Sequence, residues 1–451
     1  MPKSEQGGTR YFYARDRYEM AMPPGSYRME VVCGICHETV VRQFQVEPGA
    51  AQTVDVRIPV LRDPHASGWY SGNTHTHYNL DIEEDPDDRL CLVPPAEALD
   101  VSVISYVVRN RIEYVTNRYP VGRLPAFSKN GTIVDMGEEC RNNIPEGSHG
   151  YGHVLFLNIP RLVEPVSTGW LARQPNAPDF PTISMLCKEA RKLGGTAIWC
   201  HNGKRMELPV AAALGALDAF NVGDSQEGEY SRYYQLLNCG LRMPISTGTD
   251  WWIYDHNRVF VQIRGKFSYD TWLEGLRAGR TFITNGPLLD FSVDGRMAGE
   301  TVVPSRRVHV RAYALSRLPF ERLQIIQDGE IVAERTAAGG REASFEGDIA
   351  VVRSGWMAAR VAANARTHAS RVVFAHTGPA YLKLERRANL SGAAVLVDEL
   401  ADSIHFIRKN YEFASQADLA IAVGRFEQAR QHYAKLAATC SGEDCMKRTL
   451  S

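Results

Sequence analysis

The chain lacks any long apolar run. No stretch of about 18 apolar residues, the length that spans a bilayer, occurs in its 451 residues. Residues 1–8 are polar and glycine-rich, so they do not form the apolar segment of a signal peptide. We therefore expect a soluble, cytoplasmic protein as given. Strand-like sequence already begins at residue 11, which leaves open a secreted or periplasmic location in case a leader has been removed.

Long runs of one charge are also missing. The 51 Lys and Arg residues nearly balance the 52 Asp and Glu residues, and the formal net charge is -1. This balance argues against nucleic acid or an anionic membrane as a partner. The pair Arg306-Arg307 is interpreted as solvated surface. We expect a small-molecule substrate as the partner, while the oligomeric state is left undetermined by the sequence.

Cysteine is sparse. The nine cysteines are an odd number at scattered positions, which favours reduced thiols over a disulfide framework. Cys187 and Cys200 lie in apolar stretches and are predicted to be core residues. Residues 33–37 read Cys-Gly-Ile-Cys-His, the haem-attachment pattern, but this short motif lies inside a predicted β-hairpin. No haem is expected.

Two common catalytic motifs are absent. The chain has no Gly-x-x-x-x-Gly-Lys-Ser/Thr loop to bind phosphates. Residues 223–228 are one position out of register with the nucleophile elbow of serine hydrolases, so that class of enzyme is not supported. The chemistry must come from other side chains.

Changes in sequence pattern divide the chain into four parts. Alternating runs such as 27–31 and 53–58 predict a small antiparallel β module. Helical patterns followed by short apolar runs then predict α/β units. Further alternation predicts a β-sandwich, and an Ala- and Leu-rich end predicts a tail of two helices broken at Gly424. The four predicted parts are residues 1–66, 67–288, 289–383 and 384–451.

Three α/β units are clear in the second part. In each unit a helix ends at a glycine and a short apolar strand follows. Polar residues just beyond such strands gather at the carboxyl edge of the sheet, where barrel enzymes keep their active sites. The predicted helices are residues 183–193, 230–239 and 268–278, and the predicted strands are residues 196–200, 243–247 and 281–284.

Residues at the strand ends form a candidate metal site. His75 and His77 are two positions apart, so in a strand both imidazoles face one side and can bind one ion. His201 and Asp250 each follow a predicted strand. Each alone has a structural alternative: His201 could be a core histidine, and Asp250 could be a helix cap. Together at one edge of the sheet, they predict a metal-dependent hydrolase.

Further ligands are less determined by the residues alone. Glu138 or Glu139 follows an apolar run and is a candidate bridging carboxylate, and His153 begins another such run. Adjacent glutamates are commonly solvated, so both cases stay open at this point. Imidazole and hard oxygen ligands suit Zn, Mn or Fe and argue against a cysteine-based structural zinc site. One or two divalent ions are expected.

The order of these motifs resembles that of a known family. Residues 72–77 read Gly-Asn-Thr-His-Thr-His, and the further motifs are residues 137–139, 152–153, 195–202, 236–242, 248–250 and 279–287. They resemble the PHP (polymerase and histidinol phosphatase) superfamily, and within it the carbaryl-hydrolase-like branch. The resemblance covers roughly residues 10–380. It implies an α/β fold with a distorted seven-stranded (β/α) barrel, flanked by the β module and the β-sandwich.

The resemblance also implies a ligand set for two ions. One ion would be held by His75, His77, Glu139 and Asp250, and the other by Glu139, His153 and His201. Glu139 is preferred to Glu138 because the last acid of this motif is usually the bridging one in the family.

Two positions depart from the family pattern. Many relatives have Thr-Asp-His where residues 105–110 read Ser-Tyr-Val-Val-Arg-Asn, and Trp251-Trp252 follows Asp250 where a histidine ligand is usual. At most two ions are therefore expected. An ion lowers the pKa of a bound water and polarises the scissile carbonyl or phosphoryl oxygen. Asp250 and His201 are the predicted catalytic residues, with Asp250 passing the proton of the water to the leaving group.

Side chains around the ligands are predicted to bind the substrate. Aromatic rings there could stack on an aromatic or sugar-like substrate, and cations could neutralise an anionic one. Their structural alternatives are core packing and solvation. The aromatic candidates are Tyr78, Trp251 and Trp252, and the cationic candidates are Lys204, Arg141 and Arg258.

Three functions fit these features. The leading hypothesis is a hydrolase of a small ester, amide or carbamate. The nearest alternative is a phosphoesterase on the same site, since other branches of the superfamily cleave phosphate esters. The third is a degenerate, non-catalytic barrel whose β modules bind a carbohydrate or a protein, and the missing ligands motivate it. Retention of a divalent ion separates this third reading from the two enzymes.

Overall fold

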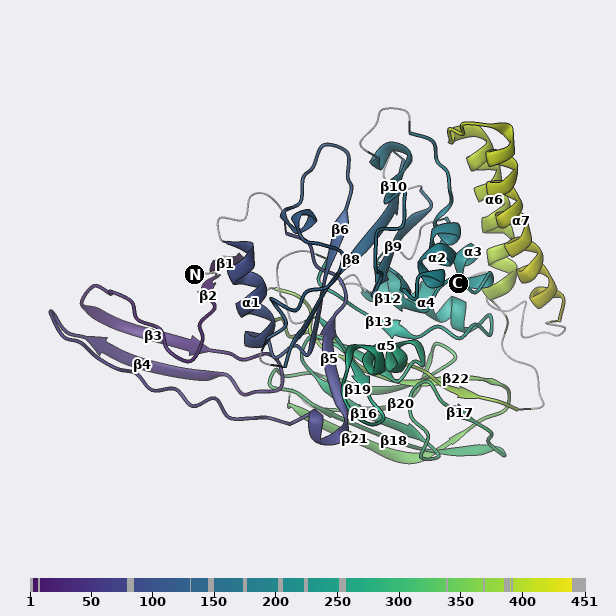
Figure 1. The fold of residues 1–451 in the computed structure, drawn as a ribbon. Coiled ribbons are helices and arrows are strands. Elements are labelled where there is room, and N and C mark those ends of the chain that lie inside the picture. The colour runs from purple at the N-terminus through teal and green to yellow at the C-terminus, as the bar shows by residue number, and fades with distance from the viewer. Residues whose placement is uncertain are drawn as a thin grey trace.

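The computed structural model begins with two short hairpins that precede the main body (Figure 1). β1 (Lys3–Gln6) pairs with β2 (Thr9–Phe12), and β3 (Gly25–Val31) pairs with β4 (Val40–Val46) in a hairpin that reaches away from the rest of the molecule. Residues 53–58 alternate in exposure as predicted but belong to no strand, so that prediction is wrong. The structure describes residues 3–6, 9–78, 85–129, 131–144, 150–172, 177–201, 206–222, 226–250, 257–337, 340–367, 370–384, 390 and 392–439.

A mixed sheet forms the centre of the fold and positions the candidate site. Its strands lie in the spatial order β13, β12, β11, β9, β8, β6, β5, β14, β15. Strands buried on both faces read as continuous apolar runs, as β9 and β11 do. The bounds are β5 (Trp69–Asn73), β6 (Val101–Val107), β7 (Gly122–Arg123), β8 (Ile133–Asn142), β9 (Gly152–Leu157), β10 (Ser167–Thr168), β11 (Thr196–Trp199), β12 (Ala219–Asn221), β13 (Ile245–Ser246), β14 (Arg258–Gln262) and β15 (Thr281–Thr284).

The strand directions differ from a simple β/α alternation. β5, β6 and β8 run parallel, and so do β11, β12 and β13. β9 is antiparallel to both neighbours, and Asn142 at the end of β8 pairs with Gly152 at the start of β9. A hydrogen bond from Thr281 Oγ1 to the carbonyl of Ile245 (2.9 Å) links β15 to β13, without a strand ladder between the two. The structure thus shows a mixed α/β sheet, and it does not show the predicted closed barrel.

The helices of this part follow the sequence signals closely. α2 (Ile183–Lys192) and α5 (Tyr269–Arg277) match their predicted ranges within about a residue. Ser268 caps α5, since its hydroxyl accepts a hydrogen bond from the backbone N–H of Thr271 at 3.2 Å. Gly279 ends the same helix with a left-handed φ of +74°. The other elements are α1 (Pro86–Ala96), α3 (Leu208–Ala213), α4 (Gln226–Leu237), η1 (His65–Ser67), η2 (Val115–Arg118) and η3 (Gly169–Leu171).

The predicted β-sandwich is present as two packed sheets. β16, β18 and β21 form one sheet, and β18 and β21 bury alternate residues against the other. Asp328 and Gly329 form the predicted turn, with positive φ at both residues. β23 pairs with β15, so the second sheet continues into the central one. The bounds are β16 (Leu288–Val293), β17 (Thr301–Val302), β18 (Arg307–Leu315), β19 (Arg322–Gln327), β20 (Glu330–Thr336), β21 (Glu342–Ala350), β22 (Gly355–Ala362), β23 (Ala375–Thr377) and β24 (Ala380–Leu382).

Two long helices, α6 (Gly392–Asn410) and α7 (Gln416–Thr439), pack side by side at the C-terminal end (Figure 1). The predicted break at Gly424 is wrong, because Gly424 lies inside α7. A glycine costs a helix only about 1 kcal/mol relative to alanine, so it need not end one. The break falls before Ser415, whose hydroxyl accepts a hydrogen bond from the N–H of Asp418 at 3.1 Å.

These helices are joined to the central part by polar contacts. The hydroxyl of Tyr411 donates to Asn142 Oδ1 (3.3 Å), and Nε of Arg425 donates to the hydroxyl of Ser184 (2.8 Å). The tail is therefore packed on the body of the molecule. Among the described residues, none of the helices combines the length and the apolar character needed to cross a membrane.

Candidate metal centre

His75 and His77 lie in the segment that directly follows β5. Both imidazoles are buried, and their Nε2 atoms are 2.9 Å apart. Nδ1 of His77 donates to the carbonyl of Ser105 at 3.1 Å, which leaves the Nε2 lone pair directed into the site. Gly248 lets a second loop approach, because a Cβ there would lie 2.6 Å from Cβ of His75. The pair is thus oriented from two sides.

Glu139 stands at the centre of the cluster, within β8. Its Oε2 lies 2.7 Å from Nε2 of His77 and 3.4 Å from Nε2 of His75. Its Oε1 lies 3.1 Å from Nδ1 of His153 and 3.7 Å from Nε2 of His201. Each carboxylate oxygen therefore faces a different pair of imidazoles.

Glu138 points to the opposite face of the same strand, since neighbouring residues alternate. Its Oε2 accepts a hydrogen bond from the N–H of Val163 at 2.7 Å. Burial raises the pKa of Glu138 to about 8, so its carboxyl is mostly protonated at neutral pH. Of the two adjacent glutamates, only Glu139 faces the histidines.

Asp250 closes the cluster from the loop after β13. Its φ of +65° is left-handed, a conformation that costs a non-glycine residue about 1–3 kcal/mol. Its N–H donates to the carbonyl of His75 at 3.0 Å, which holds the loop in place. Oδ1 lies 3.2 Å from Nε2 of His75, and Oδ2 lies 3.6 Å from Nε2 of His201. This carboxylate thus faces His75 and His77 of one pair and His201 of the other.

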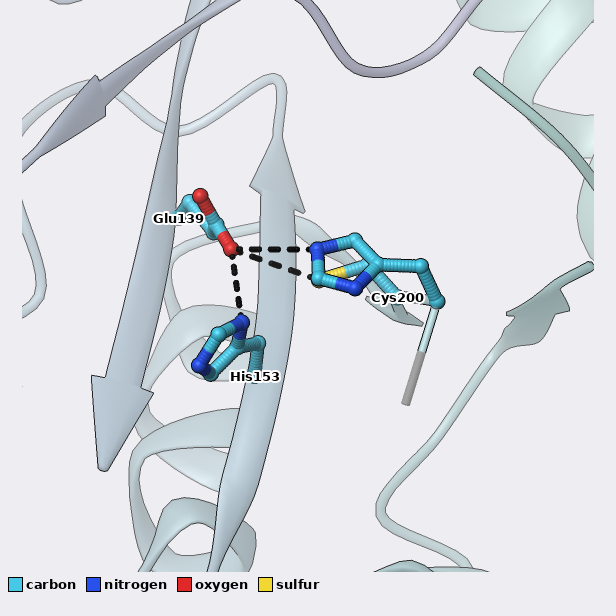
Figure 2. Close-up of side chains that lie close together, drawn as sticks. Glu139, His153 and Cys200 are labelled. Atoms are coloured by element: carbon cyan, nitrogen blue, oxygen red, sulfur yellow. Dashed lines mark hydrogen bonds and ion pairs between the residues drawn. The ribbon is translucent and has the colours of Figure 1, made fainter. Parts of the chain in front are cut away.

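The direction of β9 explains how His153 reaches the site. An antiparallel strand begins at the edge of the sheet where its neighbours end. His153 is the second residue of β9, so it lies beside the end of β8 and the residues after β11. Figure 2 shows His153 and Cys200 facing the same oxygen of Glu139.

The ligand-type atoms form two groups that share Glu139. Within each group the atoms lie within 4.8 Å of one another. Nε2 of His201 and Oδ1 of Asp250 are buried without a hydrogen-bond partner, and the His77 lone pair faces a carboxylate. Such an arrangement needs a cation or a proton between the facing atoms, so it fits divalent ions. The first group is His75, His77, Glu139 and Asp250, and the second is Glu139, His153, Cys200 and His201.

Charge is unevenly distributed in this cluster. Burial raises the pKa of Glu139, but Arg141 and His75 outweigh burial and hold that pKa well below its usual range. Burial, together with Arg141, lowers the pKa of His153 to about 3. Burial also lowers the pKa of His201, but the carboxylates beside it outweigh burial and raise the value to about 9. Without an ion, His201 therefore carries a proton and His153 does not.

Arg141, predicted as a substrate-binding cation, lies against the cluster. It is buried, and its Nε donates to Oε1 of Glu139 at 3.0 Å. Burial lowers its pKa, but Glu139 and Asp250 outweigh burial and raise it, so the guanidinium stays charged. Its Nη1 is buried without a hydrogen-bond partner. This nitrogen can therefore donate a hydrogen bond to an anionic group.

Two other predicted substrate contacts lie away from the site. Tyr78 is fully buried in a small hydrophobic cluster, with the guanidinium of Arg89 5.8 Å from its ring centre, so it is not on the rim as predicted. Arg258 forms a buried ion pair with Glu97 at 3.2 Å and neutralises that carboxylate instead of a substrate. The predicted contacts Trp251, Trp252 and Lys204 lie outside the described residues.

Three residues of the site were not predicted. Cys200 is buried as expected of a core residue, yet its Sγ lies 3.7 Å from Oε1 of Glu139. The Ser105 carbonyl orients His77, and the ring of Tyr114 lies 5.4 Å from the His77 ring. A backbone carbonyl leaves no signal in a sequence. A cysteine directly before His201 could have suggested a further ligand. Side chains alternate along a strand, however, and this argues against both neighbours facing one site.

Comparisons with known proteins add little. No protein-family model matches the chain, and none of the curated proteins matches it. A crystal structure described as a two-domain protein containing a predicted PHP-like metal-dependent phosphoesterase, from Bacteroides vulgatus, is similar over 74% of this chain and 100% of its own. The sequence identity is 12% and the TM-score is 0.34, which is too low to carry an argument about fold or function.

Proposed function

We propose that this protein is a metal-dependent hydrolase that cleaves a small ester, amide or carbamate. One observation carries the proposal: four imidazoles and two carboxylates from five segments of the central part converge into two ligand groups that share Glu139. One or two divalent ions would be held there. Membership of the PHP superfamily and of its carbaryl-hydrolase-like branch is part of the proposal and is supported by the motif order in the sequence.

The exposure of the ligands indicates the side from which a substrate arrives. The side chains of His201 and Asp250 are 23% and 25% exposed, whereas that of Glu139 is 0% exposed. A bound ion would supply a water activated near neutral pH and polarise the oxygen of the scissile bond. Asp250 would accept the proton of the attacking water and donate it to the leaving group. Nε2 of His201 lies 3.6 Å from Oδ2 of Asp250. Burial raises the pKa of Asp250, but His201 and His75 outweigh burial and lower that pKa.

Metal removal tests the proposal. The purified protein is analysed for bound ions, stripped with a chelator and assayed on aryl esters, carbamates, amides and phosphomonoesters, before and after zinc or manganese is returned. We expect hydrolysis to disappear with the ion and to return with it. A protein that binds no divalent ion would instead support the degenerate, non-catalytic alternative.

A phosphoesterase is the second candidate, and Arg141 is the observation that favours it. Its buried, unpartnered Nη1 beside the two carboxylates is a suitable donor to a phosphate oxygen. If the substrate is a phosphate ester, Arg141→Met should lower phosphomonoester cleavage by about 100-fold, and ester cleavage much less. Arg311→Met, at an exposed arginine of the sandwich, is the control. Equal losses on both substrates would argue against a phosphate-binding role.

A further inference from the structure

Cys200 and His201 are consecutive residues that follow β11. Neighbouring side chains of an extended strand point to opposite faces, so only one of the two should reach Glu139. The backbone departs from this rule at His201, whose φ is +24°. As a result, Sγ of Cys200 and Nε2 of His201 both lie 3.7 Å from Oε1 of Glu139. Strain of this kind persists where the surroundings enforce it, and it is concentrated at functional sites.

The thiol of Cys200 faces polar atoms, although the residue is fully buried. Its Sγ belongs to the group formed by Glu139, His153 and His201, whose atoms all lie within 4.8 Å of one another (Figure 2). The distances from Oε1 of Glu139 are 3.1 Å to Nδ1 of His153 and 3.7 Å to Sγ. Ligands that lie about 2.0–2.3 Å from a tetrahedral zinc ion are about 3.3–3.7 Å from each other. The two distances of 3.7 Å from Oε1 of Glu139, to Sγ and to Nε2 of His201, match this spacing, and that of 3.1 Å to His153 is slightly shorter. The group offers one sulfur, two nitrogens and one oxygen.

We propose that Cys200 binds as a thiolate to an ion in this second group, and that the sulfur makes the position selective for zinc. On binding, the S–H bond breaks, its proton passes to solvent and the sulfur electron pair forms the bond to the ion. Thiolate ligands favour zinc over magnesium, calcium and manganese. The inference rests on the proposed function for the presence of ions and adds the identity of one of them.

The first group has no sulfur. Its ligands are two imidazoles and two carboxylates, which suit manganese and iron as well as zinc. The two positions therefore differ in selectivity, although they share Glu139. A protein loaded with manganese alone would fill the first position and leave the second one weakly occupied.

Cobalt is the probe for the sulfur ligand. The full-length protein is stripped with a chelator and reloaded with cobalt, and its near-ultraviolet absorption is recorded. We expect a sulfur-to-cobalt charge-transfer band that is lost in Cys200→Ser and kept in Cys187→Ser, a control at an equally buried cysteine of α2. The inference is overturned if the wild-type protein shows no such band, or if Cys200→Ser keeps it.

Affinity gives a second readout. Competition with a chelator should show that Cys200→Ser loses more than about 100-fold in zinc affinity at one position, beyond the 10–100-fold that a lost outer-shell partner costs. Manganese affinity should stay nearly unchanged. Equal losses for both ions, or none for zinc, would contradict the selectivity.

The wild-type protein keeps the inference testable if Cys200→Ser does not fold. X-ray absorption of the zinc-loaded protein should show a sulfur neighbour at about 2.3 Å. Only nitrogen and oxygen neighbours would refute the thiolate. A sulfur-bound ion in a protein that hydrolyses nothing would instead refute the proposed function and leave the metal site standing. Active hydrolysis without sulfur ligation would refute the thiolate ligand and leave the proposed function standing.

Discussion

His376 and His77 are both buried imidazoles. His376 lies in β23 and contacts Tyr234 of α4, and His77 follows β5. Nδ1 of His376 donates to the carbonyl of Thr377 at 2.6 Å, and its Nε2 accepts a hydrogen bond from the hydroxyl of Tyr234 at 2.7 Å. Each ring nitrogen thus has one partner of the right kind. Burial, with Arg360 nearby, lowers the pKa of His376 to about 3. It is a neutral core histidine.

His77 begins in the same way and ends differently. Its Nδ1 also donates to a carbonyl, but its Nε2 faces two groups, Nε2 of His75 and Oε2 of Glu139, and the ionised carboxylate has no proton to donate to it. The loops around it contain left-handed residues at His201 and Asp250. Burial alone therefore does not identify a ligand histidine. Converging atoms without matching partners, on a strained backbone, do.

Of the changes that test this comparison, replacing His77 should have the largest effect on hydrolysis. His77→Ala removes a donor of the first group, and a metal ion contributes several kcal/mol of transition-state stabilisation. We therefore expect hydrolysis to fall by about a thousandfold or more, together with loss of bound ion. Metal analysis and kcat/KM on the best substrate measure both. His309→Ala, at an exposed histidine of the sandwich, should change neither, and full activity without His77 would refute the mechanism.

Asp250→Asn should have the next largest effect. The amide keeps an oxygen for the ion but cannot carry the proton, and a positioned acid or base contributes about 10²–10⁴-fold. We expect kcat to fall within this range while the ion content falls less than in His77→Ala. Measurements of metal content and kcat on the same sample check both expectations. Full turnover with full metal content would exclude the proton-transfer role.

The sequence predicted much of the site because ligand types and spacing are local. His75, His77, His201 and Asp250 were chosen from their positions at strand ends, and the structure brings them together. Resemblance was needed to choose Glu139, since the residues alone left it equal to Glu138. The tertiary environment decides the remaining cases: it encloses Tyr78 in a core, and the unusual φ of His201 brings a neighbouring cysteine to the site.

The fold was predicted where local signals suffice. The capped helix α5 and the turn at Asp328 were found because caps and turns depend on a few adjacent residues. Strand direction and pairing are long-range, so the antiparallel placement of β9 and the absence of a ladder for residues 53–58 left no local trace. The division into four parts stays a prediction.

His376→Phe should reduce stability and leave catalysis intact. The phenyl ring occupies similar space but removes the acceptor of the Tyr234 hydroxyl and a donor to the Thr377 carbonyl, and losing a buried hydrogen-bond partner costs about 1–3 kcal/mol. Thermal and urea unfolding should report this loss, while ion content and kcat stay at wild-type values. A loss of bound ion in this variant would contradict the assignment of His376 as a core histidine without a role in the metal site.

Acidification should have the smallest effect, and it tests through unfolding stability whether His376 is a neutral core histidine. The pKa of His376 is about 3 in the folded protein, below the ordinary value of 6.5. Between these values the unfolded chain binds a proton that the folded protein does not, so stability falls as the pH falls below 6.5. This loss of stability cannot exceed about 1.4 kcal/mol per pH unit.

Comparing wild type with His376→Phe cancels the contributions of the other titratable groups. From pH 7 to pH 5, wild type should lose about 1–2 kcal/mol more than the variant does, so the stability difference between them shrinks. A difference that is independent of pH would mean that His376 is not held neutral by burial and by Arg360.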